Sequence, residues 1–291
     1  MIRKMATNLT SEGLKLTIIT INLNNKAGLE RTIQSVISQT YKDFEYILID
    51  GGSLDGSVDI IKKYERNIFC WISEKDFGIY NAQNKGIQKS NGEYCLFMNS
   101  GDIFIKSTIL AEMISYIDGE DILYGNGFFQ IKKDKLDKFE CPDRLTLGFF
   151  TLYSLIHPAT LIKKSLFDKY GLYNESNKIV SDWEFFIKTT ILNTVITKLI
   201  PLEISIVEEN GISRNAENIT ILREERIKVF TNFFPHYVID LMNDYKDIYL
   251  ENIKLVDKIK FFSEINSYRK NILFRIILKM MRVLNRDIHC S

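Results

Sequence analysis

The sequence predicts an α/β fold with a mostly parallel central sheet flanked by helices, and two observations lead to this class. Short apolar segments alternate with segments of helical periodicity through residues 16–98. Strands and helices that alternate at so short a period form parallel strands joined by right-handed crossovers. Each apolar segment also ends in a cluster of polar residues. Ligands of such sheets bind outside the carboxyl ends of the strands, so these clusters indicate a binding crevice.

The expected elements follow from the apolar pattern in chain order. Strands are predicted at residues 16–21, 44–49, 68–72 and 93–98, where apolar side chains run almost without interruption. Helices are predicted between them at residues 29–38, 58–64 and 79–89, where apolar residues recur at helical spacing. Because the carboxyl ends of parallel strands meet at one edge, Asp50, Asp76 and Asp102 are expected to converge on one crevice.

The turn after the second strand, DGGSLDGS at residues 50–57, is the most informative segment. Asp50 ends the strand, and Gly51 and Gly52 let the backbone approach a ligand closely. Asp55 and Ser57 are typical of a helix start, because their oxygens accept hydrogen bonds from free amides. The turn indicates a nucleotide site, and a tight strand-to-helix connection without a ligand remains the alternative.

Composition narrows the class of protein. With 291 residues and 45% hydrophobic content, the chain is long enough for one good core and a smaller appendage. A formal net charge of +1 argues against a nucleic-acid binder. The four cysteines form no C-x-x-C pair, and reduced thiols in a cytoplasm fit them best. No G-x-G-x-x-G follows an early strand and no P-loop motif occurs, which argues against a nicotinamide enzyme and excludes a P-loop kinase.

Beyond residue 216 the chain changes character and reads as helices. They are expected at 221–232, 237–251, 253–265 and 268–284, with a break at Pro235. In the last one, Arg275, Lys279, Arg282 and Arg286 recur at helical steps and share one face. Residues 268–286 therefore suit peripheral contact with an anionic membrane surface, at the inner face of a cell membrane, although packing on the same domain or on a partner subunit of a homo-oligomer is equally open. Charges interrupt this segment too often for it to span a membrane.

An ordered series of blocks carries a resemblance to a known family. The blocks read ITINLNN, LERTIQSVISQTY, FEYILIDGGSLDGS, SEKDFGIYNAQNKGI, NGEYCLFMNSGD, HPATLIKKSLFDKYG and SDWEFFIK. Together they resemble the family 2 glycosyltransferases, which are bacterial enzymes of the GT-A fold. The expected organisation is then a polar tail at residues 1–13, a nucleotide-sugar-binding catalytic domain at 14–215 and a helical region at 216–291.

The resemblance implies an activity and its partners. It implies transfer of a hexosyl or N-acetylhexosaminyl group, with inversion, from a nucleotide sugar, a UDP-sugar being favoured. It also implies Mn²⁺ or Mg²⁺ as cofactor, and a glycan or lipid-linked acceptor in capsule, O-antigen or exopolysaccharide biosynthesis. A cation held by oxygen ligands can neutralise the charge that builds on a departing diphosphate.

Some candidate donor contacts, such as Asp50, follow from the resemblance, and others, such as Thr20, from their place at a strand end or in a polar loop. The candidates are Thr20, Asn22, Asp50, Asp76, Lys85, Asn99, Ser100 and Arg214. Asp76 has the alternative of capping the next helix, and Lys85 that of a solvated surface charge. Arg214 lies in the polar segment 208–218, which is either a lid hinged at Gly211 or a surface connector.

The metal site departs from the family pattern. The family carries D-x-D where this chain reads Asn99, Ser100, Gly101, Asp102, so Asp102 is the candidate ligand and the first carboxylate is absent. One carboxylate can suffice, because Mg²⁺ often keeps several waters. The alternative is a noncatalytic nucleotide-sugar-binding module or inactive subunit. His157 is a further candidate contact for the metal or diphosphate, against the alternative of a core histidine.

Asp182, in SDWEFFIK, matches the place of the family's catalytic base. A carboxylate there would take the proton from the attacking acceptor hydroxyl. Ser181 and Asp182 before a helix also suit an ordinary N-cap, and Glu184 is the second candidate base.

Overall fold

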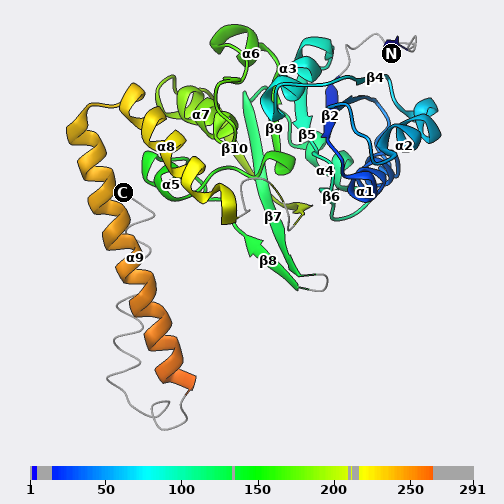
Figure 1. The fold of residues 1–291 in the computed structure, drawn as a ribbon. Helices are drawn as coiled ribbons and strands as arrows, with labels where there is room; N and C mark the ends of the chain where they lie inside the picture. Colours follow the sequence, from blue (N-terminus) through cyan, green and yellow to red (C-terminus); the bar gives the residue numbers. More distant parts are fainter. Residues whose placement is uncertain (1, 5–14, 133–134, 209–210, 212–215, 265–291) are drawn as a thin grey trace. The chain divides into compact units, whose positions relative to one another are not determined.

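The computed structural model of the chain describes residues 2–4, 15–132, 135–208, 211 and 216–264. Its contacts divide the chain into two units, Met1–Phe230 and Thr231–Ser291. The first unit contains the whole β-sheet (Figure 1). The second unit contains a long helix, α9 (His236–Glu264).

The sheet has ten strands, and its first half is the predicted parallel core. Four neighbouring strands run parallel in the order β4-β3-β2-β5. Each coincides within two residues with a strand expected from the apolar pattern, which confirms that part of the prediction. They are β2 (Leu16–Asn22), β3 (Phe44–Asp50), β4 (Cys70–Ser73) and β5 (Tyr94–Phe97).

Helices cover both faces of this parallel half. The core cluster joins Leu16 and Leu48 of the strands to Leu29, Ile61 and Met113 of three helices on one face. Those helices are α1 (Lys26–Ile37), α2 (Ser57–Lys63) and α4 (Ile109–Ser115). The intervening strand residues face the other way, where α3 (Ile79–Lys89) lies against β2 and β3. There Gly86 approaches Ile19 so closely that a Cβ would lie 2.5 Å from its side chain.

The second half of the sheet is mixed in direction. Here β7 and β10 pair in parallel, while β9 pairs antiparallel with both β5 and β7. Pro201 lies where the pairing of β10 with β7 shifts register, as expected for a residue without an amide donor. The strands are β6 (Ile103–Phe104), β7 (Ile122–Lys132), β8 (Lys135–Phe139), β9 (Thr160–Lys163) and β10 (Thr197–Val207).

The N-terminal segment differs from its prediction. Residues Ile2–Lys4 form strand β1, which pairs antiparallel with β4, although residues 1–13 are expected as a polar tail. An edge strand leaves its unpaired groups free to bond another extended segment, and β4 is such an edge of the parallel half. Residues 1 and 5–14 lie outside the described residues.

Three short helices follow in the first unit: α5 (Leu147–Leu152), α6 (Ser165–Tyr170) and α7 (Ser181–Phe186). The longer helix α8 (Ile219–Phe233) comes after β10 in the chain. The two helices expected at 237–251 and 253–265 form a single helix, α9, because an Asn at position 252 costs too little to end it. In the described part of the chain, no helix has the length and apolar character to cross a membrane. The basic segment 268–286 and Cys290 lie outside the described residues.

Candidate functional site

Strand register places the first candidates side by side at the carboxyl edge. Asn22 of β2 lies opposite Asp50 of β3, which lies opposite Ser73 of β4. The Asn22 amide donates to Asp50 Oδ1 at 2.8 Å, and the Ser73 hydroxyl donates to Oδ2 at 2.7 Å. Asp50 also accepts the amide and hydroxyl of Ser53 and the amide of Gly52, and it is fully buried. These five donors hold the carboxylate inside the turn that follows β3.

The turn itself is shaped by two glycines. Gly52 has φ +82°, a left-handed conformation, and a Cβ on Gly51 would clash with the Asp76 carboxylate. Asp76 thus packs on the turn while its Oδ1 accepts the Gly78 amide at 3.0 Å just before α3. The capping alternative for Asp76 therefore describes one of its contacts, and its donor contact stays a prediction.

The Asn22 side chain carries a buried acceptor oxygen that no described group uses. Its Oδ1 has no hydrogen-bond partner, although the residue is only 4% exposed. On α3, the buried Gln83 likewise leaves Oε1 without a partner, while its Nε2 lies 3.4 Å from Asn99 Oδ1. Unpaired buried acceptors cost free energy, so a ligand N–H or O–H would be favoured at both atoms.

Thr20 and Lys85, two further donor candidates, have protein partners. Thr20 is fully buried, and its hydroxyl contacts the Tyr46 hydroxyl and the Met98 carbonyl. Lys85 forms an ion pair with Glu74 at 2.7 Å and is partly exposed. A donor role for either residue stays a prediction, and Arg214 lies outside the described residues.

The segment Asn99–Asp102 forms a tight turn after β5. The Asp102 amide donates to the Asn99 carbonyl at 2.9 Å, and Gly101 has φ +106°. The Ser100 amide bonds Ile21 of β2 at 3.0 Å. This turn is therefore fixed to the end of β2, beside the edge that carries Asp50.

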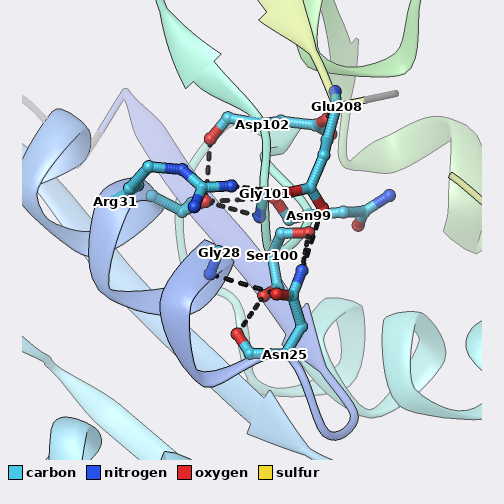
Figure 2. Close-up of polar contacts among 9 residues, drawn as sticks. Asn25, Gly28, Arg31, Asn99, Ser100, Gly101, Asp102 and Glu208 are labelled. Carbon is cyan, nitrogen blue, oxygen red and sulfur yellow. Dashed lines mark hydrogen bonds and ion pairs between the residues drawn. The ribbon is translucent and has the colours of Figure 1, made fainter. Parts of the chain in front are cut away.

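A carboxylate from a distant strand lies over this turn (Figure 2). Glu208 follows β10, and its carboxylate occupies the space that a Cβ on Gly101 would need. It forms an ion pair with Arg31 of α1 and accepts the Asn25 amide at 3.0 Å. The sequence alone does not single out Glu208 as a site candidate. In three dimensions it supplies a second carboxylate to a loop that lacks the first one of D-x-D.

Asp102 is buried beneath Glu208. Its Oδ1 accepts the Glu208 backbone amide at 3.0 Å. The pKa of Asp102 is raised to about 7, mainly by burial; the hydrogen bond from the Glu208 amide opposes this rise, and the charge of Glu208 adds to it. Among the described residues, no three His, Cys, Asp or Glu side chains are grouped as metal ligands.

Asp182 lies in the first turn of α7, and α3 holds it. Tyr80 donates its hydroxyl to Asp182 Oδ1 at 2.8 Å. Burial, and then the nearby charge of Asp182, raises the pKa of Tyr80 well above its usual value, so it remains a neutral donor. The cap of α7 is Val180, with no side-chain cap bond, so the half-buried Asp182 is not used as the N-cap. One turn further along α3, Gln83 contacts Asn99, which links the candidate base to the Asn99–Asp102 turn.

Glu184 and His157 have other surroundings. The Glu184 carboxylate accepts from Asn177 at 2.6 Å and from Asn174 at 3.3 Å. His157 is buried, with its ring stacked 4.4 Å from Phe97 and Nε2 2.9 Å from the Tyr173 hydroxyl. Burial lowers the pKa of His157 to about 4, which the charge of Asp182 opposes. These contacts fit a core histidine, and a metal contact for His157 stays a prediction.

Helix α8 contacts α7 and the residues just before it. Glu225 accepts the backbone amides of Lys178 and Ile179 at 2.6 and 3.0 Å. The Arg226 guanidinium lies 4.8 Å over the Trp183 ring, and Phe230 meets the same ring edge-on. The pair Glu225-Arg226 gives no signal in the sequence, because adjacent opposite charges on a helix are usually solvated.

Of the segment 208–218, Glu208, Gly211 and residues 216–218 are described.

Comparison with known proteins identifies the family. The model of Glycosyl transferase family 2 matches residues 17–171, more than half of the chain. An uncharacterized glycosyltransferase of Mycobacterium tuberculosis is 31% identical over 188 residues, covering 62% of this chain and 71% of its own. A PGL/p-HBAD biosynthesis glycosyltransferase of Mycobacterium bovis is 27% identical over 218 residues, covering 73% and 82%.

Solved structures share the fold. S. aureus TarS 1-349 in complex with UDP-GlcNAc has a TM-score of 0.60 at 16% identity, covering 78% of this chain and 70% of its own. The match spans 42% of another TarS structure's chain. The mannosyltransferase PcManGT from Pyrobaculum calidifontis, in complex with GDP-Man and Mn²⁺, has a TM-score of 0.54 at 12% identity, covering 96% and 88%. These likenesses show the GT-A fold.

Proposed function

The chain belongs to glycosyltransferase family 2, and we propose that it transfers one hexosyl or N-acetylhexosaminyl group, with inversion, from a UDP-sugar to a glycan or lipid-linked acceptor. One observation carries this proposal. Helix α3 bonds Asp182 through Tyr80 and contacts Asn99 through Gln83, so a free carboxylate oxygen and the NSGD loop are positioned by the same helix. An inverting displacement needs a base and a leaving-group site held in fixed relation.

The donor's nucleoside fits the carboxyl edge of β2 and β3. The buried Asn22 Oδ1 has no partner, and a nucleobase or ribose presents N–H and O–H donors. Asp50 keeps Asn22 and the glycine turn in place. The complex of TarS with UDP-GlcNAc supports a UDP-sugar, because this neighbour shares the fold. We therefore assign Asn22 as the direct nucleoside contact and Asp50 as the residue that positions it.

The donor set for a divalent cation is Asp102 with Glu208. Both are hard oxygen ligands of the kind that Mg²⁺ and Mn²⁺ prefer; Asp102 belongs to the Asn99–Asp102 turn, and Glu208 packs against it. Such a cation would compete with Arg31 for the Glu208 carboxylate. When bound, it neutralises charge on the departing diphosphate. The Mn²⁺ in the PcManGT complex supports this cofactor.

Asp182 then acts as the base. Tyr80 bonds one carboxylate oxygen, and no described residue hydrogen-bonds the other, which is left for the acceptor hydroxyl. The acceptor belongs to a bacterial surface polysaccharide such as capsule, O-antigen or exopolysaccharide. Contact of residues 268–286 with a membrane surface would bring the enzyme to a lipid-linked acceptor.

A panel of nucleotide sugars tests the proposal. We expect one UDP-sugar with Mn²⁺ to raise the melting temperature most, because a ligand of the folded state stabilises it by mass action. That donor should then be hydrolysed slowly in a Mn²⁺-dependent reaction. Binding without any turnover, across varied acceptors, would favour the noncatalytic module instead.

A further inference from the structure

The guanidinium of Arg226 is a charged group without an acceptor. Within the described chain it makes no hydrogen bond or ion pair, and its Nε is buried with no partner. The guanidinium stacks on the face of the Trp183 ring, a cation–π contact. A buried donor that gives up water and gains no acceptor destabilises the fold, and a charged one does so most. Stacking on an aromatic ring offsets only part of this cost.

Arg226 is held in place from several directions. Trp183 is 2% exposed, and its Nε1 donates to the Phe150 carbonyl at 2.9 Å, so the stacking platform is rigid. The neighbouring Glu225 clamps α8 to two backbone amides, and the buried Val229 anchors the next turn. The guanidinium is therefore preorganised, which lowers the entropy lost when it binds a partner. A surface arginine without a ligand would keep its rotamer freedom in water.

Arg226 interacts electrostatically with the candidate base, Asp182. Its charge interacts with that of Asp182, although the two side chains do not form an ion pair within 4.0 Å. Asp182 is instead held by Tyr80, and Glu225 is occupied by the amides of residues 178 and 179. Among the described residues, no carboxylate thus forms an ion pair with Arg226. The planar fork of an arginine suits the paired oxygens of phosphate or carboxylate.

We propose that Arg226, stacked on Trp183 beside Asp182, binds an oxyanion of the acceptor substrate, a phosphate ester or a carboxylate close to the hydroxyl that attacks. The proposal rests on the proposed function, because it takes Asp182 as the base. In an inverting displacement the base and the leaving diphosphate lie on opposite sides of the anomeric carbon. An arginine next to the base therefore serves the acceptor, whereas the donor diphosphate lies toward the Asn99–Asp102 turn.

The test measures anion binding by thermal shift on the full chain, without requiring turnover. With UDP and Mn²⁺ saturating, inorganic phosphate is titrated in one arm and acetate in another. We expect a further rise in melting temperature in the wild type, larger with phosphate for a phosphate ester and larger with acetate for a carboxylate. Arg226→Gln should weaken this anion binding at least tenfold while keeping the shift caused by UDP. Arg223→Gln, an exposed arginine one turn earlier on α8, should behave as wild type.

Three results overturn the proposal. They are no added shift in the wild type, an unchanged anion shift in Arg226→Gln, or loss of the UDP shift in that variant, which would place Arg226 at the donor. If Arg226→Gln does not fold, Arg226→Lys replaces it, since it keeps the charge without the planar fork. An anion affinity unchanged in Arg226→Lys then counts against the subsite. The UDP shift of the wild type tests the proposed function separately.

Discussion

The two halves of the sheet differ in what holds their functional side chains. In the parallel half, strand register alone puts Asn22, Asp50 and Ser73 in a row. In the mixed half, Glu208 and Asp182 reach the site through side-chain contacts with other elements, namely Arg31 of α1 and Tyr80 of α3. The proposed donor contacts are thus positioned by backbone geometry, while the proposed base and second carboxylate depend on tertiary packing. Substitutions should separate these two kinds of support.

The largest effect is expected at the proposed base. Asp182→Asn removes the proton acceptor but keeps the shape and the bond to Tyr80, so kcat should fall about 10²–10⁴-fold. The thermal shift caused by the donor should stay near wild type, because the proposed nucleoside contacts belong to the parallel half. Glu184→Gln is the matched control, since its carboxylate bonds Asn177. Retained turnover in Asp182→Asn would remove Asp182 from this role.

Acid should destabilise the mixed half through His157. Its pKa is about 4 in the folded chain against about 6.5 when exposed, so the unfolded chain binds more protons between these values. The stabilisation is complete above pH 6.5 and is lost as pH falls toward 4, by about 2 kcal/mol between pH 7 and pH 5. Denaturant unfolding at both pH values measures this loss. His157→Phe, which fills the aromatic surroundings without titrating, should reduce the loss by that amount, and an identical loss in both proteins would contradict the prediction.

A substitution at Gly101 tests the contact between the Asn99–Asp102 turn and Glu208, where the two halves of the sheet meet. Gly101→Ala should lower the free energy of unfolding by about 2 kcal/mol, because φ is +106° and a Cβ would clash with Glu208. Gly119→Ala is the matched control, with φ +93° and open space around the Cβ position. The difference between the variants isolates the contact with Glu208. Equal losses measured by denaturant unfolding would mean that Glu208 does not fill that space in solution.

The smallest effect is expected at Tyr80 of α3, whose hydroxyl bonds the proposed base, Asp182. Tyr80→Phe removes one hydrogen bond to Asp182, which should lower kcat about tenfold through poorer positioning and leave the donor's thermal shift unchanged. Gln83→Leu, one turn away on the same helix, should affect donor binding instead. If Tyr80→Phe loses donor binding and keeps kcat, the Tyr80 hydroxyl serves donor binding and does not position the base.

The same division explains how far the sequence could be interpreted. Apolar runs predict β2 to β5 because each strand is buried on both faces, and the residue at each carboxyl end then follows from counting. Glu208 could not be predicted, because its importance comes from the missing side chain at Gly101, more than a hundred positions away. Tyr80 reads as an apolar helix residue, and nothing in the sequence pairs it with Asp182. Contacts between side chains on separate elements leave no periodic signal in the chain.

Asn25 connects helix α1 to the Asn99–Asp102 turn and to Glu208, and its position requires an amide side chain. Its Oδ1 accepts the Gly28 amide at 3.0 Å and so caps α1, while its Nδ2 donates to the Ser100 carbonyl and to Glu208. A single amide group thus faces a donor on one side and two acceptors on the other. Aspartate has the same size and would begin the helix equally well, yet it would turn attraction toward Glu208 into repulsion. Asparagine joins three segments there because its two ends have opposite polarity.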